Sequence, residues 1–454
     1  MSLGIGLGGI VRRHEDGSTS LFRPGRNGGP AIEIEALPEI ADAHRLATGD
    51  VVRGDFEPRL PALAWDDEVE DDDDVDLDAQ FDEPSAISGI VRAPAPSRRG
   101  PSERLTRVTA INGLDLDAAA DRPSPRSKRA STERVPPDLR ITCARGPGDV
   151  TGRMLDFAAP LGAGVFGVVY GPHGGGLTRI LQCVLRGALQ SAPDCVPIVL
   201  LLRPRAEEAT DWREQAPEAD IVVASAAFSD APPEHVLQIC TLVLEAAQRQ
   251  TELGRDVVLM VDSLTALWGL MLEAVDADAQ HEADISSARQ RIREWAQKAG
   301  CFHGEGLLGG RLGGSLTIIG SVWHQGIDIE AEEERDTHPH LRLLEHLLPE
   351  AAWLVPLSEP LKERRLFPAI DIKQCRSQYE DRLVAPAILE ELLRVRGALS
   401  RKNPVAAHLR VMEALDASAG TEDLLPELAK RNAEAAAENP EPASIDWLPF
   451  FPAE

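Results

Sequence analysis

A glycine-rich turn between an apolar stretch and a helical stretch is the part of the chain whose residue types best fit chemistry. Residues 167–179 read GVVYGPHGGGLTR. In the phosphate-binding motif G-x-x-x-x-G-K-[ST], glycines let backbone N–H groups surround a phosphate, lysine neutralises its charge and the hydroxyl binds Mg²⁺. Gly171, Gly176 and Thr178 match this motif, whereas Leu177 stands at the lysine position. The turn is therefore predicted to be a phosphate loop that has lost its main positive charge.

A second segment ends in an acid that could belong to the same site. Residues 257–263 read VVLMVDS, an apolar strand that ends in Asp262. A carboxylate at such a place organises Mg²⁺ in nucleotide-hydrolysing proteins, but aspartate also ends strands in order to cap the next helix. Both interpretations stay open from the residues alone. If a nucleotide binds, Thr178 and Asp262 are the predicted Mg²⁺ ligands.

No other group of residues has a spacing typical of a catalytic or metal site. The histidines from His303 to His346 show no accepted ligand spacing, and Ser263 lacks a His/Asp pair at a recognised offset. The six cysteines form no CxxC pair, which favours reduced thiols over a disulfide framework. We therefore expect neither a zinc site nor a serine hydrolase.

Apolar strands that alternate with helical stretches surround the loop and must position it. The predicted strands cover 165–170, 196–202, 221–224, 256–261, 315–319 and 352–356. The predicted helices cover 178–190, 207–215, 233–253 and 285–298. Short, continuously apolar strands between helices indicate an α/β domain whose parallel sheet is covered on both faces.

The N-terminal part predicts a small β-barrel with an acidic insertion. Its strands are expected at 9–13, 20–23, 50–54, 87–92 and 104–114. Residues 66–83 contain twelve acids and no basic residue, so they repel one another and cannot form a core. We interpret this acidic run (residues 66–83) as a solubilising spacer, with a site for a basic protein partner as the alternative.

Length and charge limit the classes of protein that this chain can be. With roughly 100–200 residues per core, 454 residues predict two or three domains. We place a barrel at 1–120, a linker rich in Pro, Ser and Arg at 121–138, an α/β domain at 139–400 and a helical, Pro-rich tail at 401–454. A net charge of −27 argues against a polyanion bound by bulk electrostatics. No stretch reaches the roughly 20 apolar residues of a membrane span, so we expect a cytoplasmic protein without a membrane partner.

Further segments resemble the family of the bacterial transcription termination factor Rho. In the α/β part they are VTGRMLD at 150–156, APLG at 159–162, VDSLT at 261–265, GSLTII at 314–319 and RLFPAID at 365–371. In the barrel they are TGDVVRG at 48–54 and VTAINGL at 108–114, so that the similarity covers roughly residues 8–400. The family consists of hexameric RNA-dependent ATPases. The resemblance therefore implies a RecA-like P-loop core preceded by a small OB-like, cold-shock-type barrel.

The resemblance assigns roles to positions that this chain has partly replaced. Leu177 replaces the phosphate-binding lysine, and Pro204 stands where the family has the catalytic glutamate that polarises water. Arg365 matches the arginine finger and is the catalytic candidate, while Glu359 replaces a second arginine of that interface. The positions that would bind ATP and Mg²⁺ are Gly171, Gly174, Gly175, Gly176, Leu177, Thr178 and Asp262.

The segments that contact RNA in the family are replaced as well. The Gly-Phe-Gly-Phe stacking segment corresponds to residues 18–22, STSLF, which offer at most one aromatic side chain, Phe22. The pore loops correspond to 281–287 and 326–334, and the second reads GIDIEAEEE where the family supplies a lysine. Base stacking is worth about 1–3 kcal/mol per base, and carboxylates repel phosphates. The sequence therefore weighs against RNA binding.

These replacements lead to one hypothesis and one alternative. The hypothesis is an ATPase-impaired Rho-like paralogue, a pseudoenzyme with a regulatory or assembly role, in a homo-hexamer or in a mixed ring with a genuine Rho. ATP and Mg²⁺ would bind weakly, with Arg179 supplying charge from a different angle. The alternative is a divergent but active ATP-dependent RNA translocase that terminates transcription, with Arg179 and Glu207 or Glu208 as substitutes.

Overall fold

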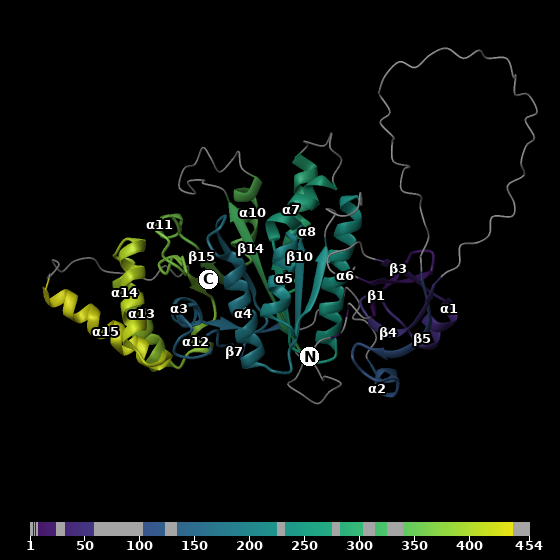
Figure 1. The fold of residues 1–454 in the computed structure, drawn as a ribbon, viewed down its shortest axis with the longest axis horizontal. Helices are drawn as coiled ribbons and strands as arrows, with labels where there is room; N and C mark the ends of the chain where they lie inside the picture. The colour runs from purple at the N-terminus through teal and green to yellow at the C-terminus, as the bar shows by residue number, and fades with distance from the viewer. Residues whose placement is uncertain are drawn as a thin grey trace, which may run out of the picture.

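A computed structural model describes most of the chain (Figure 1). The described residues are 3, 5, 8–23, 32–58, 103–122, 134–224, 232–274, 282–302, 314–324 and 339–438. The acidic run, the strand expected at 87–92, the pore-loop segment at 326–334 and the Pro-rich end of the tail lie outside them and stay predictions. Among the described residues, no helix combines the length and the apolar character that crossing a bilayer requires.

The N-terminal residues form a closed five-stranded barrel. Its strands are β1 (Gly9–Arg13), β2 (Thr19–Arg23), β3 (Ile32–Ala36), β4 (Val51–Pro58) and β5 (Glu103–Ile111), in the order β1-β2-β3-β5-β4. The predicted barrel is thus confirmed, but β3 is an unpredicted strand. Its alternating IEIEA segment sends Ile34 and Ala36 into the barrel core. Two short helices, α1 (Pro38–Ala43) and α2 (Leu116–Ala120), accompany the strands.

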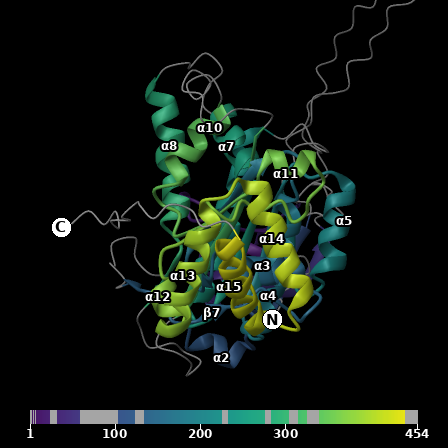
Figure 2. The same cartoon turned by 90° about the vertical axis from the view of Figure 1, so that its left-hand side faces the viewer.

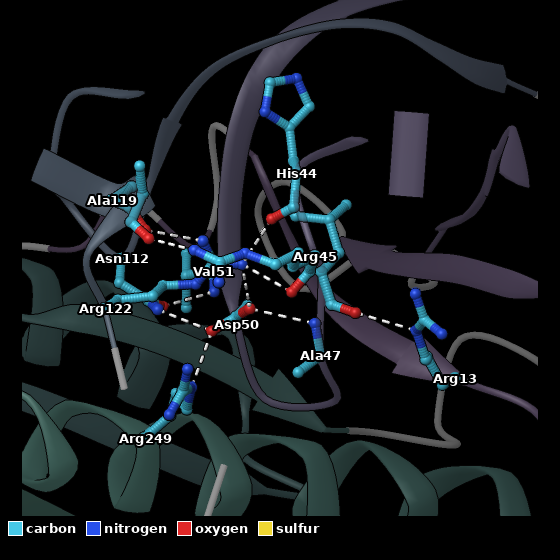
Figure 3. A network of polar contacts seen from close by, with 12 residues as sticks. Arg13, His44, Arg45, Ala47, Asp50, Val51, Asn112, Ala119, Arg122 and Arg249 are labelled. Carbon is cyan, nitrogen blue, oxygen red and sulfur yellow. Dashed lines mark hydrogen bonds and ion pairs between the residues drawn. The ribbon is translucent and has the colours of Figure 1, made fainter. Parts of the chain in front are cut away.

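A buried polar cluster links the barrel to helix α6 (Pro233–Glu252), as Figure 3 shows. Asp50, fully buried just before β4, accepts hydrogen bonds from Arg122 Nη2 at 3.2 Å and from Arg249 Nε of α6 at 2.9 Å. Asn112 Nδ2 donates to the same carboxylate at 2.7 Å. One carboxylate therefore connects the start of a barrel strand to a helix of the second unit.

The second unit is built on a nine-stranded sheet. Along its main path lie β11 (Asp220–Ala224), β10 (Val196–Leu202), β12 (Val257–Asp262), β14 (Ser315–His324), β9 (Phe166–Pro172), β15 (Trp353–Pro356) and β16 (Arg376–Ser377). Off this path, β13 (Gly300–Phe302) pairs with the start of β14 and with β6 (Arg134–Val135). The strands from β11 to β15 correspond to the six predicted ones and run parallel. The predicted fold class is therefore confirmed.

Helices cover both faces of this sheet (Figure 1). One face packs against α6, α7 (Leu264–Glu273), α8 (Glu282–Ala296) and α10 (Pro339–Leu347). The other packs against α3 (Val150–Ala158), α4 (Leu177–Ser191) and α5 (Ala206–Gln215). Neighbouring residues of a strand point into opposite cores, as Val168 and Val169 of β9 do. Two buried faces explain why the strands read as continuous apolar runs.

The C-terminal helices pack on the same face as α3 and α4 (Figure 2). They are α13 (Pro386–Ser400), α14 (Pro404–Ala417) and α15 (Thr421–Glu438). Arg153 of α3 is buried and donates to the carbonyl oxygens of Leu415 at 3.2 Å and Gly420 at 2.7 Å. The helices of the predicted tail therefore complete the α/β core. The domain boundary placed at residue 401 stays a prediction.

His408 of α14 gives this helical layer a predicted pH dependence. Its side chain is buried, its Nδ1 has no hydrogen-bond partner among the described residues, and burial lowers its pKa below the ordinary value of 6.5. Near pH 6 the histidine is therefore protonated more readily in the unfolded chain than in the folded chain. The free energy of unfolding then falls as the pH drops below 6.5, by at most about 1.4 kcal/mol per pH unit. Urea unfolding at pH 7.5 and 5.5 should show a smaller acid loss for His408→Leu than for wild type. His44→Leu, at a half-exposed histidine, is the control, and equal losses in all three proteins would contradict the prediction.

Candidate nucleotide site

The glycine loop joins the end of β9 to the start of α4. Gly174 and Gly176 have φ angles of 75° and 99°, a left-handed conformation that glycine adopts without strain. A Cβ atom at Gly171 would lie 2.6 Å from Leu357 Cβ, so only glycine fits there. Gly175 N–H donates back to the last carbonyl of β9 at 2.9 Å. The loop leads into the first N–H groups of α4, which have no acceptor within the helix and favour anions.

Asp262 at the end of β12 faces the start of α4. Thr178 Oγ1 donates to its Oδ2 at 2.9 Å, Trp212 Nε1 to the same oxygen at 3.3 Å, and Ser321 Oγ to Oδ1 at 2.7 Å. Burial raises the pKa of Asp262, while these hydrogen bonds lower it. Ser263, not Asp262, caps α7, since its Oγ accepts from a backbone N–H three residues later at 3.1 Å. The capping interpretation of Asp262 is therefore wrong, and the two predicted Mg²⁺ ligands are in contact.

The lysine position of the loop belongs to the apolar core. The Leu177 side chain is only 9% exposed and packs with residues of α3, α4 and the sheet. It therefore supplies neither charge nor a hydrogen bond to the loop. The other predicted loop residues are four glycines and Thr178, and none of them carries a basic group.

Two residues predicted to substitute for the missing lysine and glutamate, Arg179 and Glu208, bind other partners. Arg179 Nη1 pairs with Asp211 Oδ1 of α5 at 3.1 Å, so its charge is directed to α5. Glu208 Oε2 accepts the N–H of Arg205 at 2.9 Å and closes the N-terminus of α5. Glu207 is exposed on the same turn. Pro204 lies half-buried between β10 and α5 and carries no base at the position that the resemblance gives to the catalytic glutamate.

Arg365 lies on an exposed turn after the short helix α11 (Glu359–Glu363). Its φ is 57°, and its N–H donates to the carbonyl oxygen of Lys362 at 2.9 Å. Glu359, the residue at the position of the second arginine, binds Lys362 Nζ through its Oε1 at 2.9 Å. The arginine-finger candidate is thus a surface residue, separate from the Thr178–Asp262 contact.

Three residues of the site were not among the predicted ones. Ser321 lies on β14 beyond the predicted end of that strand at 319, and parallel pairing with β12 brings its hydroxyl to Asp262. Trp212 reaches the same carboxylate from α5 across 50 residues of sequence. Lys362 lies near Gly174, 188 positions earlier in the chain. Only Ser321 had a sequence signal, because the apolar run of its strand continues to Trp323.

The barrel surface where the resemblance places RNA carries acids and ion pairs. Glu33 of β3 accepts a hydrogen bond from Ser20 Oγ at 2.8 Å, and Glu35 pairs with Arg104 at 3.2 Å. Phe22, the one aromatic side chain of the segment that corresponds to the stacking segment, is 6% exposed and lies edge-on to His235 of α6, with ring centroids 6.1 Å apart. Phe22 therefore packs between the barrel and α6, and its ring is not free to stack on a base.

The parallel sheet, the glycine loop and the acid at the end of β12 together define the RecA-like class of P-loop proteins. Residues 152–377 match the ATP synthase alpha/beta family, nucleotide-binding domain. Among curated proteins, the transcription termination factor Rho of Aquifex aeolicus (strain VF5) is 28% identical over 329 residues, which are 72% of this chain and 71% of that protein. The Rho of Thermotoga maritima is 26% identical over 354 residues, 76% of this chain and 75% of that protein. The chain is thus similar to Rho termination factors over about 70% of its length, as the sequence segments predict.

A solved structure adds support for the fold alone. The assembled ATPase EscN from the enteropathogenic E. coli type III secretion system superposes with a TM-score of 0.52 at 16% identity. The match covers 75% of this chain and 79% of that protein. At this identity the likeness concerns the arrangement of sheet and helices, not the site.

Proposed function

We propose that this chain is a Rho-family paralogue with impaired ATP hydrolysis that acts in a ring, as a regulator or an assembly partner. The observation that carries the proposal is the burial of Leu177, which leaves the phosphate loop without its lysine. Pro204 adds a second loss at the position given to the base. Phosphoryl transfer depends on electrostatic positioning, and the loss of one such group costs on the order of 10²–10⁵ in rate. Two losses leave little turnover.

The loop still fits a nucleotide with Mg²⁺. Its left-handed glycines leave the backbone open, since a Cβ at Gly176 would meet no atom within 4 Å. Thr178 and Asp262 together offer a hydroxyl and a carboxylate, the oxygen ligands that Mg²⁺ prefers beside phosphates. When bound, Mg²⁺ would neutralise charge on the phosphate oxygens. Weak nucleotide binding without efficient hydrolysis is what this set of residues supports.

The surface supports a partner that is a protein and not RNA. The net charge is −27, and Glu33 and Glu35 occupy the barrel strand next to the former stacking segment. Arg365 on its exposed turn is available to a neighbouring subunit, in a homo-hexamer or in a mixed ring with a genuine Rho. We place the protein in the cytoplasm, with the acidic run as a candidate contact for a basic partner.

The hydrolysis test compares the full-length protein with its Asp262→Asn variant. We expect ATP turnover, measured as phosphate release with and without RNA, to be no higher for wild type than for the variant. RNA-stimulated turnover that disappears in Asp262→Asn would overturn the proposal in favour of the alternative, an active and divergent translocase.

Ring assembly needs a separate measurement. The tagged protein is mixed with the genuine Rho of the same organism, and native mass spectrometry counts the copies of each chain. A closed ring, either of this chain alone or mixed, is the expected result. A monomer under both conditions would contradict the assembly role, whatever the hydrolysis assay finds.

A further inference from the structure

One lysine lies at the glycine loop although it comes from a different element. A Cβ atom built at Gly174 would have a single neighbour within 4 Å, the Cε atom of Lys362, at 4.0 Å. Lys362 is on α11, and its ammonium group is one bond beyond that carbon. The side chain is 31% exposed, so the ammonium is accessible from the open side of the loop. A cation is therefore present at the mouth of the loop in spite of Leu177.

The backbone holds α11 in this position. Leu357 N–H, just before the helix, donates to Tyr170 O of β9 at 2.7 Å, and Ser358 N–H donates to Ala369 O at 2.8 Å. Leu361 of α11 is fully buried. Leu357 also packs directly on the loop, where it would collide with any side chain at Gly171. These contacts fix α11 relative to β9, the strand that precedes the loop. The position of Lys362 beside the loop is therefore fixed as well.

The ammonium of Lys362 has one carboxylate partner. Its Nζ lies 2.9 Å from Glu359 Oε1, and the Glu359 side chain is 33% exposed. Glu359 Oε2 has no hydrogen-bond partner within the described part of the chain. A half-exposed pair of this kind is worth about 0–1 kcal/mol, and a triphosphate carries several negative charges where the carboxylate carries one. A phosphate group at the loop can therefore draw Lys362 away from Glu359.

We propose that Lys362 is a nucleotide-binding residue, which supplies from α11 the positive charge that Leu177 cannot supply from the loop. The ligand class is a nucleoside di- or triphosphate, whose terminal phosphates Lys362 binds after leaving Glu359. The inference rests on the proposed function, in which the loop keeps weak nucleotide binding. The guanidinium of the predicted substitute Arg179 contacts Asp211 of α5 and Gln182 of α4, whereas Lys362 lies at Gly174 of the loop itself.

The test measures binding, not hydrolysis. Fluorescence anisotropy of a fluorescently labelled ATP with Mg²⁺ gives Kd for wild type, Lys362→Ala, Glu359→Gln and Lys298→Ala. Loss of one charge-assisted contact to phosphate should weaken binding about tenfold or more in Lys362→Ala. Glu359→Gln should bind at least as tightly as wild type, because it frees the ammonium and removes a negative charge. Lys298 lies between α8 and β13, which pairs with the start of β14, whereas the loop follows the end of the parallel strand β9, so its variant should be unchanged.

The two α11 variants separate a role in binding from a role in structure. Both break the same ion pair, so equal weakening in both would mean that the pair merely shapes α11, and it would overturn the inference. Wild-type affinity in Lys362→Ala would overturn it too, while the proposed function would stand. No measurable binding by wild type would also overturn it, and the hydrolysis and ring-assembly results would then decide the proposed function independently.

Discussion

Replacing Asp50 with asparagine is expected to lower the free energy of unfolding by about 3–5 kcal/mol, because the change leaves buried arginines without their carboxylate. Asp50 is fully buried, and Arg122 and Arg249 have side chains that are 4% and 3% exposed. Arg249 also pairs with Glu252, three residues later on α6. Asp50→Asn removes the carboxylate that the two buried arginines share and so adds net positive charge to this buried cluster (Figure 3).

The measurement is urea unfolding of the full chain, followed by circular dichroism. Asp55→Asn is the matched control, because Asp55 lies exposed on the same strand β4 and should change stability by about 0.5 kcal/mol or less. Limited proteolysis adds a second readout, since a barrel released from α6 should be cut faster than wild type. A loss below about 1 kcal/mol, with unchanged proteolysis, would mean that the arginines find other partners.

The partners of Asp50 lie far away in the sequence, and this distance separates the features that could be predicted from those that could not. The strands of the sheet were recognisable because two-sided burial makes each a continuous apolar run, as in VPIVLLL of β10. Strand β3 was missed although IEIEA alternates as a half-buried strand should, and although other strands of the same length were recognised. Asp50 was expected as a strand residue, but nothing local identifies Arg249, 199 positions later, as its partner.

In the candidate site, too, the residues with a local sequence pattern could be predicted and those placed by tertiary packing could not. The glycines, Thr178 and Asp262 are recognisable because their spacing follows from a local turn and a strand end. Trp212 and Lys362 depend on how α5 and α11 pack against the loop, and a single chain has no local pattern for that packing. Similarly, Phe22 has the right residue type for stacking, and only the contact with α6 removes it from the surface. Residue type and spacing identify the scaffold, whereas tertiary contacts decide which side chains are available.

The double variant Leu177→Lys, Pro204→Glu is expected to raise ATP turnover about a hundredfold or more above wild type, because it returns a phosphate-binding cation and a base to a loop that otherwise fits. Thr178 and Asp262 are already in contact, so the Mg²⁺ ligands need no further change. Leu177→Lys removes an apolar side chain from the core, which should cost about 1–3 kcal/mol of stability without nucleotide. Bound nucleotide should restore part of that loss.

Phosphate release and thermal unfolding of the same samples test these expectations together. The single variants and a triple variant that also carries Asp262→Asn are the controls, and the triple variant should lose the gained turnover. If the double variant is stabilised by nucleotide but does not hydrolyse it, the missing chemistry lies beyond the loop. Glu359 would then be the next position to change, because the resemblance places an arginine there at the subunit interface while here its carboxylate binds Lys362. Turnover that appears only in an assembled ring would instead assign the remaining requirement to Arg365 of the neighbouring copy.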